Sequence, residues 1–233
     1  MIRHSGAAPG ERNEGLLDRT PDFRDRDNMA FFEAALGRLA EEENRHGGHL
    51  AIGLVEQRDL PGVALRRAQA FLRWDLRPSL WSHAFVFAGR AGEGAIADVE
   101  LREVVLHSRA GAFPDPSSNA VLKGRLSLYG DARVDANVAV MSVPLADDEF
   151  ESVAHRVLRD PNLDRLRYDF WSALGVWQSY FWSAGAAPNP LREGFPVPSS
   201  AFVEYCYEAV RLDLSPGASE RNSAPEHLWN AAV

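Results

Sequence analysis

The sequence predicts a single α+β domain in which a mostly antiparallel sheet packs with helices. Helical periodicity occupies the first third of the chain, short β-rich segments fill the middle, and helical periodicity returns in the last third. With 233 residues, 45% of them hydrophobic, the chain can bury one large core. We expect residues 1–28, which mix charges of both signs with few large apolar groups, to form a flexible arm before a domain over 29–233.

Two helices and a strand are expected before the sheet is completed. Asn28 is the expected N-cap of a helix over 29–46, whose apolar residues recur on one face before a glycine pair ends it. The short apolar run 49–55 is typical of a strand. Residues 62–74 carry an apolar stripe with arginines opposite, which indicates a second helix.

The middle and last parts of the chain differ in pattern. β-forming residues separated by Gly, Pro, Asn or Asp predict extended segments over 82–89, 94–108, 120–130 and 134–144. Acidic residues that suit a helix N-terminus, and apolar residues at helical spacing, predict helices over 147–160, 169–182 and 195–210. This order of elements predicts the α+β class.

Composition excludes several classes of function. A formal net charge of −8 argues against nucleic acid as a partner, and no segment has the roughly 18 to 20 apolar residues of a membrane span. We therefore expect a cytoplasmic protein. A single cysteine leaves no internal disulfide and no thiolate-built zinc site, and the histidines lack the i, i+4 pairing of a helical metal site. We expect no metal and no cofactor, and the sequence carries no indication of an oligomeric state.

The segment FPVPSSAFVEYCYEAV, residues 195–210, holds two candidate nucleophiles on one helical stripe. Ser199 stands at the expected helix tip, where free backbone N–H groups and the helix dipole can activate a nucleophile or hold an oxyanion. Cys206 lies two turns deeper among apolar residues, where a thiol is inert. Ser200 and Cys206 are secondary candidates. The alternative for Ser199 is a simple N-cap.

Four short motifs, in the order in which they follow along the chain, resemble those of the circularly permuted NlpC-type papain-like hydrolases. This is the bacterial YiiX-like group, which is related to the lecithin:retinol acyltransferases. WSHAFVF (81–87) resembles the family's histidine strand, and SSAFVEYCYEAV (199–210) resembles its nucleophile helix with Ser199 at the usual cysteine position. RYDFWSALGVW (167–177) and SAPEHLWNAA (223–232) resemble two further family segments. The resemblance implies a papain-like fold and a peptidase, amidase or acyltransferase activity without a cofactor.

The resemblance also implies a triad of nucleophile, His83 and an orienting acid. Asp98 takes the place of the family's acid in the segment AIADVELREV, so Ser199, His83 and Asp98 are the expected triad. Glu100 is a secondary candidate, because two residues that are two apart on a strand share a face. The implied substrate is a peptide, an acyl compound or another small molecule with an amide or ester carbonyl.

Serine at the cysteine position leaves three explanations open. A hydroxyl is a poor nucleophile in a site shaped for a thiolate, so Ser199 needs His83 as a general base. The chain is a natural serine variant, a catalytically inactive member that binds a ligand, or the product of an engineered Cys-to-Ser substitution. The sequence does not separate these three explanations. For the activity itself, acyl transfer on lipid esters is a further alternative.

Overall fold

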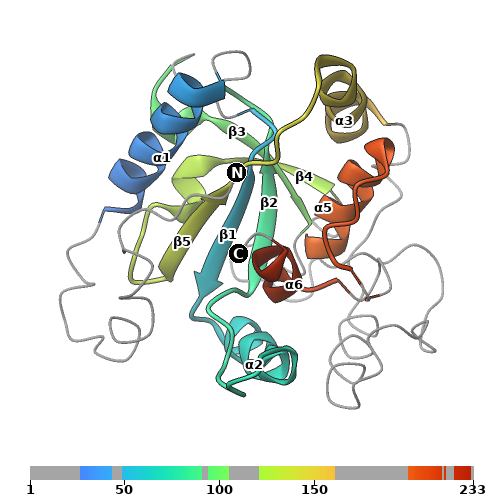
Figure 1. The fold of residues 1–233 in the computed structure, drawn as a ribbon. Helices are drawn as coiled ribbons and strands as arrows, with labels where there is room; N and C mark the ends of the chain where they lie inside the picture. Colours follow the sequence, from blue (N-terminus) through green and yellow to red (C-terminus); the bar gives the residue numbers. More distant parts are fainter. Residues whose placement is uncertain are drawn as a thin grey trace.

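Figure 1 shows the fold in the computed structural model. The structure describes residues 27–43, 49–90, 94–104, 121–160, 199–216, 218 and 223–231. Most of the expected arm, residues 1–26, and the expected helix at 169–182 lie outside the described residues.

The centre of the fold is a five-stranded antiparallel sheet with the order β4-β3-β2-β1-β5. The strands are β1 (Ile52–Gln57), β2 (His83–Phe87), β3 (Glu100–Val104), β4 (Val121–Arg125) and β5 (Asp135–Met141). Strands β1 to β4 lie side by side in chain order, and β5 returns to pair with β1. The expected α+β class and the antiparallel sheet are confirmed.

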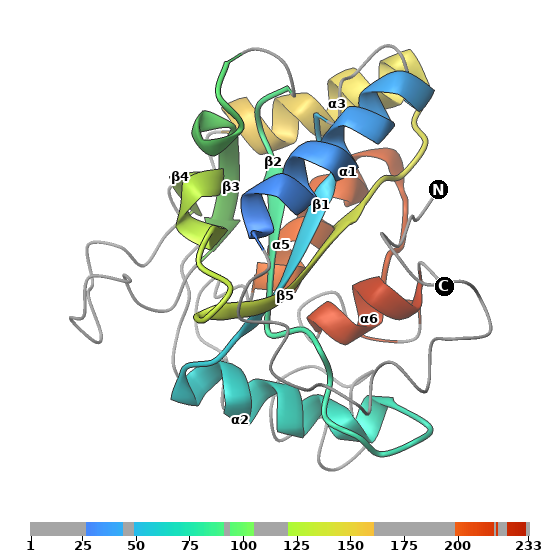
Figure 2. The ribbon, with the colours of Figure 1, turned by 90° about the vertical axis from the view of Figure 1, so that its left-hand side faces the viewer.

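Helices cover both faces of this sheet. The α-helices are α1 (Asn28–Glu43), α2 (Leu60–Ala68), α3 (Asp147–Arg159), α5 (Ser199–Tyr207) and α6 (Pro225–Asn230). Helix α1 lies on one face, α3 and α5 lie on the other, and α2 crosses one end of the sheet (Figure 2). None of the helices in the described ranges is long and apolar enough to cross a lipid bilayer.

The hydrophobic core is split between the two faces because successive strand residues point in opposite directions. In β1, Ile52 and Leu54 pack with the α5 side chain of Phe202, whereas Val55 and Ala51, the residue before the strand, pack with Phe32 of α1. All six side chains are at most 3% exposed. Because β1 and β2 are covered on both faces, most positions in them hold an apolar residue.

A glycine in β1 allows one aromatic ring to lie flat against the sheet. Gly53 pairs with Phe85 of β2, and a Cβ atom at Gly53 would lie 2.2 Å from the Phe85 ring. Only glycine fits this close approach. The Phe85 ring in turn stacks on Tyr129, with ring centroids 4.8 Å apart.

Two local expectations need correction. Asn28 is part of α1, and its side chain donates to the carbonyls of Tyr129 and Asp135 at 2.9 Å each, while Asp27 accepts from the Met29 N–H as a cap does. Asp98 lies in a 3-10 turn, Ile96–Asp98, and β3 starts only at Glu100. The strand argument that gave Asp98 and Glu100 a common face therefore does not hold.

Candidate functional site

Ser199 is the first residue of α5, and its side chain reaches the sheet. The Ser199 Oγ atom accepts a hydrogen bond of 3.2 Å from the backbone N–H of Ala84. The β2–β3 pairing goes no further than Phe85 and Glu103, so this N–H finds its acceptor in the helix instead of in the next strand. The bond fixes the start of α5 one peptide unit away from His83.

His83 is the first residue of β2 and is only 5% exposed. Its Nε2 atom lies 2.9 Å from Oε2 of Glu103 on the neighbouring strand β3. The imidazole also stacks on the ring of Tyr129, with centroids 5.9 Å apart. A carboxylate on Nε2 and an aromatic ring on one side hold the imidazole in one orientation.

Glu103 is a buried carboxylate with two donors on one oxygen. The Tyr129 hydroxyl donates to the same Oε2 atom that faces His83. On β4, Gly124 leaves the space that the carboxylate occupies, because a Cβ atom there would lie 2.8 Å from Oε1 of Glu103. The backbone of Tyr129 is itself held by the Asn28 side chain. Elements from α1 to β4 therefore cooperate in placing one carboxylate against His83.

The acids expected from the sequence lie elsewhere. Asp98 forms an ion pair of 2.7 Å with Arg125, and both side chains are more than half exposed. Glu100 forms an ion pair with Arg102. Glu100 is three residues before Glu103 along β3, so the two side chains leave the strand on opposite faces. The structure therefore brings Glu103 to His83, and brings neither Asp98 nor Glu100.

The secondary nucleophile candidates are both fully buried. Ser200 donates a hydrogen bond of 2.6 Å to the carbonyl of Ser223, so it ties α5 to the segment before α6. Cys206 is 0% exposed within the core, and burial raises the pKa of its thiol far above the usual range. Ser200 thus serves as a hydrogen-bond link and Cys206 as a packed core residue. Burial of Cys206 agrees with the expectation from its apolar neighbours.

The hydrogen-bond directions define what the site can do chemically. A carboxylate accepts only, so the bond to Glu103 places a proton on Nε2 of His83 and leaves the Nδ1 lone pair as an acceptor. The Ser199 oxygen accepts from Ala84, so its own hydrogen is available to an acceptor. Within the described residues, however, the structure shows no hydrogen bond between Ser199 and the His83 ring. His83 pairs with Val55, so its side chain leaves β2 on the face of the sheet that carries α1, whereas α5 lies on the other face.

The described residues at the site supply four chemical groups: the Ser199 hydroxyl, the His83 imidazole, the Glu103 carboxylate and the Tyr129 phenol. These groups can exchange protons, and the hydroxyl can act as a nucleophile. In the same part of the chain, no group of three or more His, Cys, Asp or Glu side chains is placed to hold a metal ion.

Sequence analysis missed Glu103 and Tyr129. No local signal singled out Glu103, because β3 reads ELREV and carries three charged residues, among which Glu100 is an equally plausible carboxylate. Tyr129 carried no local signal either, since it lies in the 3-10 turn after β4. Only the folding of the chain brings its hydroxyl to the Glu103 carboxylate.

Comparisons of the chain with protein-family models, with curated proteins and with solved structures find no match. The fold defines the class of the protein as an α+β domain with a five-stranded antiparallel sheet, and its function must be argued from the site itself.

Proposed function

We propose that this chain is a papain-like hydrolase of the permuted NlpC type, which cleaves an amide or ester carbonyl with Ser199 as nucleophile. His83 is the general base, and Glu103 takes the orienting role that the sequence assigned to Asp98. The observation that carries the proposal is the meeting of a helix tip with a histidine strand: Ser199 is bonded to Ala84, and the adjacent His83 is bonded to Glu103.

In the proposed reaction, Nδ1 of His83 takes the Ser199 proton while Oγ attacks the carbonyl carbon of the substrate. Glu103 stabilises the imidazolium that forms, and the N–H groups of the first turn of α5 stabilise the oxyanion. The imidazolium then gives its proton to the leaving group, and an acyl ester remains on Ser199. The same imidazole then deprotonates a water molecule, whose oxygen attacks the acyl carbon. The bond from that carbon to Ser199 Oγ breaks, the product leaves as a carboxylic acid, and the imidazolium returns its proton to Oγ.

A second candidate is a ligand-binding protein without catalysis. It is favoured by the placement of Ser199, which is only 5% exposed and is bonded to a backbone N–H, with no bond to the His83 ring. Attack by Ser199 requires the His83 imidazole to swing past the end of β2, because it lies with Glu103 and Tyr129 on the α1 face of the sheet and α5 lies on the other face. A protein that only binds an amide or ester compound would not need this rearrangement.

The reactivity of Ser199 separates the two candidates. A fluorophosphonate, which phosphonylates activated serines with loss of fluoride, should label the wild-type chain at Ser199, and His83→Ala should abolish the labelling. A chain that remains unlabelled at all pH values, while it still binds carbonyl ligands, would be the inactive binding protein.

A Ser199→Cys variant tests the geometry even if serine itself is unreactive. The imidazole and the helix dipole should depress the pKa of the new thiol, so that iodoacetamide alkylates it fast at neutral pH and more slowly after His83→Ala. The wild-type chain is the control, since Cys206 is its single cysteine. A rate equal to that of a free thiol, or independent of His83, would contradict the hydrolase proposal.

A further inference from the structure

The outer side of α2 and of the turn that follows it carries an unusual amount of exposed apolar surface. Among the described residues, the most exposed large apolar side chains are Trp74 at 89%, Leu60 at 86% and Leu76 at 68%, followed by Phe71 at 49%. All four lie within residues 60–76. A soluble face normally keeps such side chains scattered, so their concentration in one segment indicates a binding surface.

The exposed side chains lie along a helical segment and the turn that follows it. Helix α2 continues into a 3-10 helix, Gln69–Leu72, and the exposed positions 60, 64, 67 and 71 follow the three- and four-residue spacing of a helical stripe. Arg73 is extended, so Trp74 and Leu76 belong to the turn beyond the helix. We call the stripe together with these two residues the α2 ridge; it consists of Leu60, Ala64, Arg67, Phe71, Trp74 and Leu76. At the rise of an α-helix, the part from Leu60 to Phe71 extends for about 16 Å.

The opposite side of the same segment is fixed to the body of the protein. Gln69 is 0% exposed; its amide donates to the carbonyl of Trp81 at 2.8 Å, and its carbonyl accepts from the Glu226 N–H at 2.8 Å. The ridge therefore points away from the core and cannot turn inward. In Figure 2 the segment lies across one end of the sheet, below β1.

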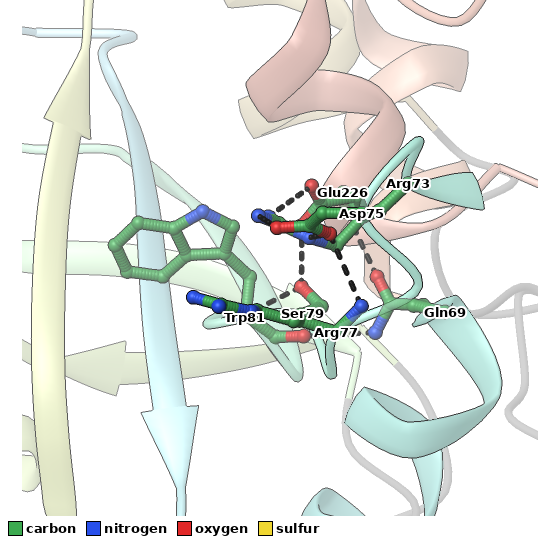
Figure 3. Close-up of polar contacts among 7 residues, drawn as sticks. All are labelled: Gln69, Arg73, Asp75, Arg77, Ser79, Trp81 and Glu226. Carbon is green, nitrogen blue, oxygen red and sulfur yellow. Dashed lines mark hydrogen bonds and ion pairs between the residues drawn. The ribbon is translucent and has the colours of Figure 1, made fainter. Parts of the chain in front are cut away.

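The turn that presents Trp74 and Leu76 is braced by a buried ionic cluster (Figure 3). Arg73 binds both carboxylate oxygens of Asp75 at 3.0 Å and one oxygen of Glu226 at 2.8 Å. Ser79 donates to the other Glu226 oxygen at 2.6 Å. Glu226 is only 1% exposed, so this cluster holds the turn against α6.

Leu76 adds evidence that the shape of the turn matters. Its φ angle of 53° lies in the left-handed region, which leucine rarely adopts because its Cβ is crowded there. The conformation is held by the bond from the Leu76 N–H to the Arg73 carbonyl and by the bond from the Arg77 N–H to Asp75. Backbone strain of this kind is kept where it serves a function, and here it places an apolar side chain in solvent.

The charge of this segment is opposite to that of the whole chain. Residues 58–78 contain five arginines and two aspartates, a net charge of +3, although the chain as a whole has −8. Arg66 and Arg73 pair with Glu56 and Glu226 from outside this range, and the exposed arginines are Arg58, Arg67 and Arg77. The α2 ridge is thus an apolar strip with exposed arginines on it and beside it, on an otherwise acidic protein.

We propose that the α2 ridge docks the protein on an anionic lipid bilayer. Tryptophan and leucine side chains enter the interface between headgroups and acyl chains, and arginines at the border reach the lipid phosphates. The apolar side chains project from a ridge instead of lining a groove, so they fit a soft surface that they can enter. The proposal is independent of the proposed hydrolase activity.

Vesicle binding tests the proposal on the full-length chain. The protein should sediment with vesicles of phosphatidylcholine and phosphatidylglycerol, less with phosphatidylcholine alone, and less at high salt. The double change Trp74→Ser and Leu76→Ser should weaken binding at least about tenfold, since each removes a large apolar group from the interface. Arg67→Glu with Arg77→Glu should remove the preference for phosphatidylglycerol.

The matched control is the double change Leu128→Ser and Val134→Ser. These side chains are 42% and 45% exposed and lie outside the ridge, so their loss should leave vesicle binding unchanged. Binding that survives the ridge changes, or that the control changes weaken equally, overturns the proposal. So does a lack of vesicle binding, including the case in which light scattering shows that Trp74 instead mediates association between copies of the chain.

Discussion

The Oγ atom of Ser199 lies 3.2 Å from the backbone nitrogen of Ala84, the residue next to His83. The first residue of α5 and the first residues of β2 are thereby joined, although they are 115 positions apart in the chain. Glu103 of β3 holds the imidazole on the α1 face of the sheet, opposite α5. The site is thus assembled where the β2–β3 pairing ends, and its properties depend on partners that can each be changed singly.

Glu103 should control the reactivity of the site, and Asp98 should not. In the Ser199→Cys background, Glu103→Gln should slow alkylation at neutral pH about tenfold, because a neutral amide no longer stabilises the imidazolium of the thiolate–imidazolium pair. Asp98→Asn is the matched control, since Asp98 pairs with Arg125 at the surface. Alkylation kinetics with iodoacetamide measure both; equal slowing by the two changes would restore Asp98 as the orienting acid.

Tyr129 should act on His83 through Glu103. Tyr129→Phe removes the hydroxyl that donates to the carboxylate, which should lower the free energy of unfolding by about 1–3 kcal/mol and also slow alkylation of the Ser199→Cys variant. Tyr207→Phe is the control, because its buried hydroxyl donates to the Leu50 carbonyl away from His83. It should cost stability without a change in alkylation. Urea denaturation measures the first effect, and the second distinguishes positioning from simple stabilisation.

The fold class could be predicted from the sequence because strands and helices carry their own periodicity. The short β-rich segments of the middle region became β2 to β5, and the apolar stripe from Phe202 to Cys206 became the buried face of α5. The acid partner of His83 could not be chosen this way. Strand register decides it: Phe85 pairs with Glu103, which sets Glu103 diagonally from His83, and a start of β3 at Glu100 leaves Asp98 in a turn. Alternation within β3 indicates which residues share a face, but the partner that each one meets on β2 is fixed only when the two strands pair.

Cys206 should react only when the protein unfolds. The thiol is 0% exposed, and burial raises its pKa, so both access and thiolate formation are suppressed in the native state. Iodoacetamide should label the native wild-type chain far more slowly than the chain in concentrated urea, with mass spectrometry as the measurement. Fast native labelling would place Cys206 at a reactive surface and would contradict its position in the core.

Glu204 should make the stability of the fold depend on pH. It lies on α5, is 2% exposed, and accepts from the N–H groups of Leu214 and Ser215 at 2.7 and 3.0 Å. Burial is the main reason that its pKa rises from 4.5 to about 7, and the neighbouring Asp213 carboxyl raises it further. The folded state therefore binds the Glu204 proton more tightly than the unfolded state does. The resulting stabilisation is fully present below pH 4.5 and is lost as the pH rises through about 7, by up to about 3 kcal/mol.

A Glu204→Gln variant removes this titration while keeping a side-chain carbonyl that can accept the two N–H bonds. The wild-type chain should lose more unfolding free energy than this variant between pH 5 and pH 9, as measured by urea denaturation at each pH. Glu208→Gln is the control, because Glu208 is exposed and pairs with Arg156 at 3.3 Å near the end of the same helix. It should retain the pH dependence of the wild type. If Glu204→Gln keeps that dependence as well, then Glu204 is ionised in the folded protein at neutral pH, and α5 carries a buried charge.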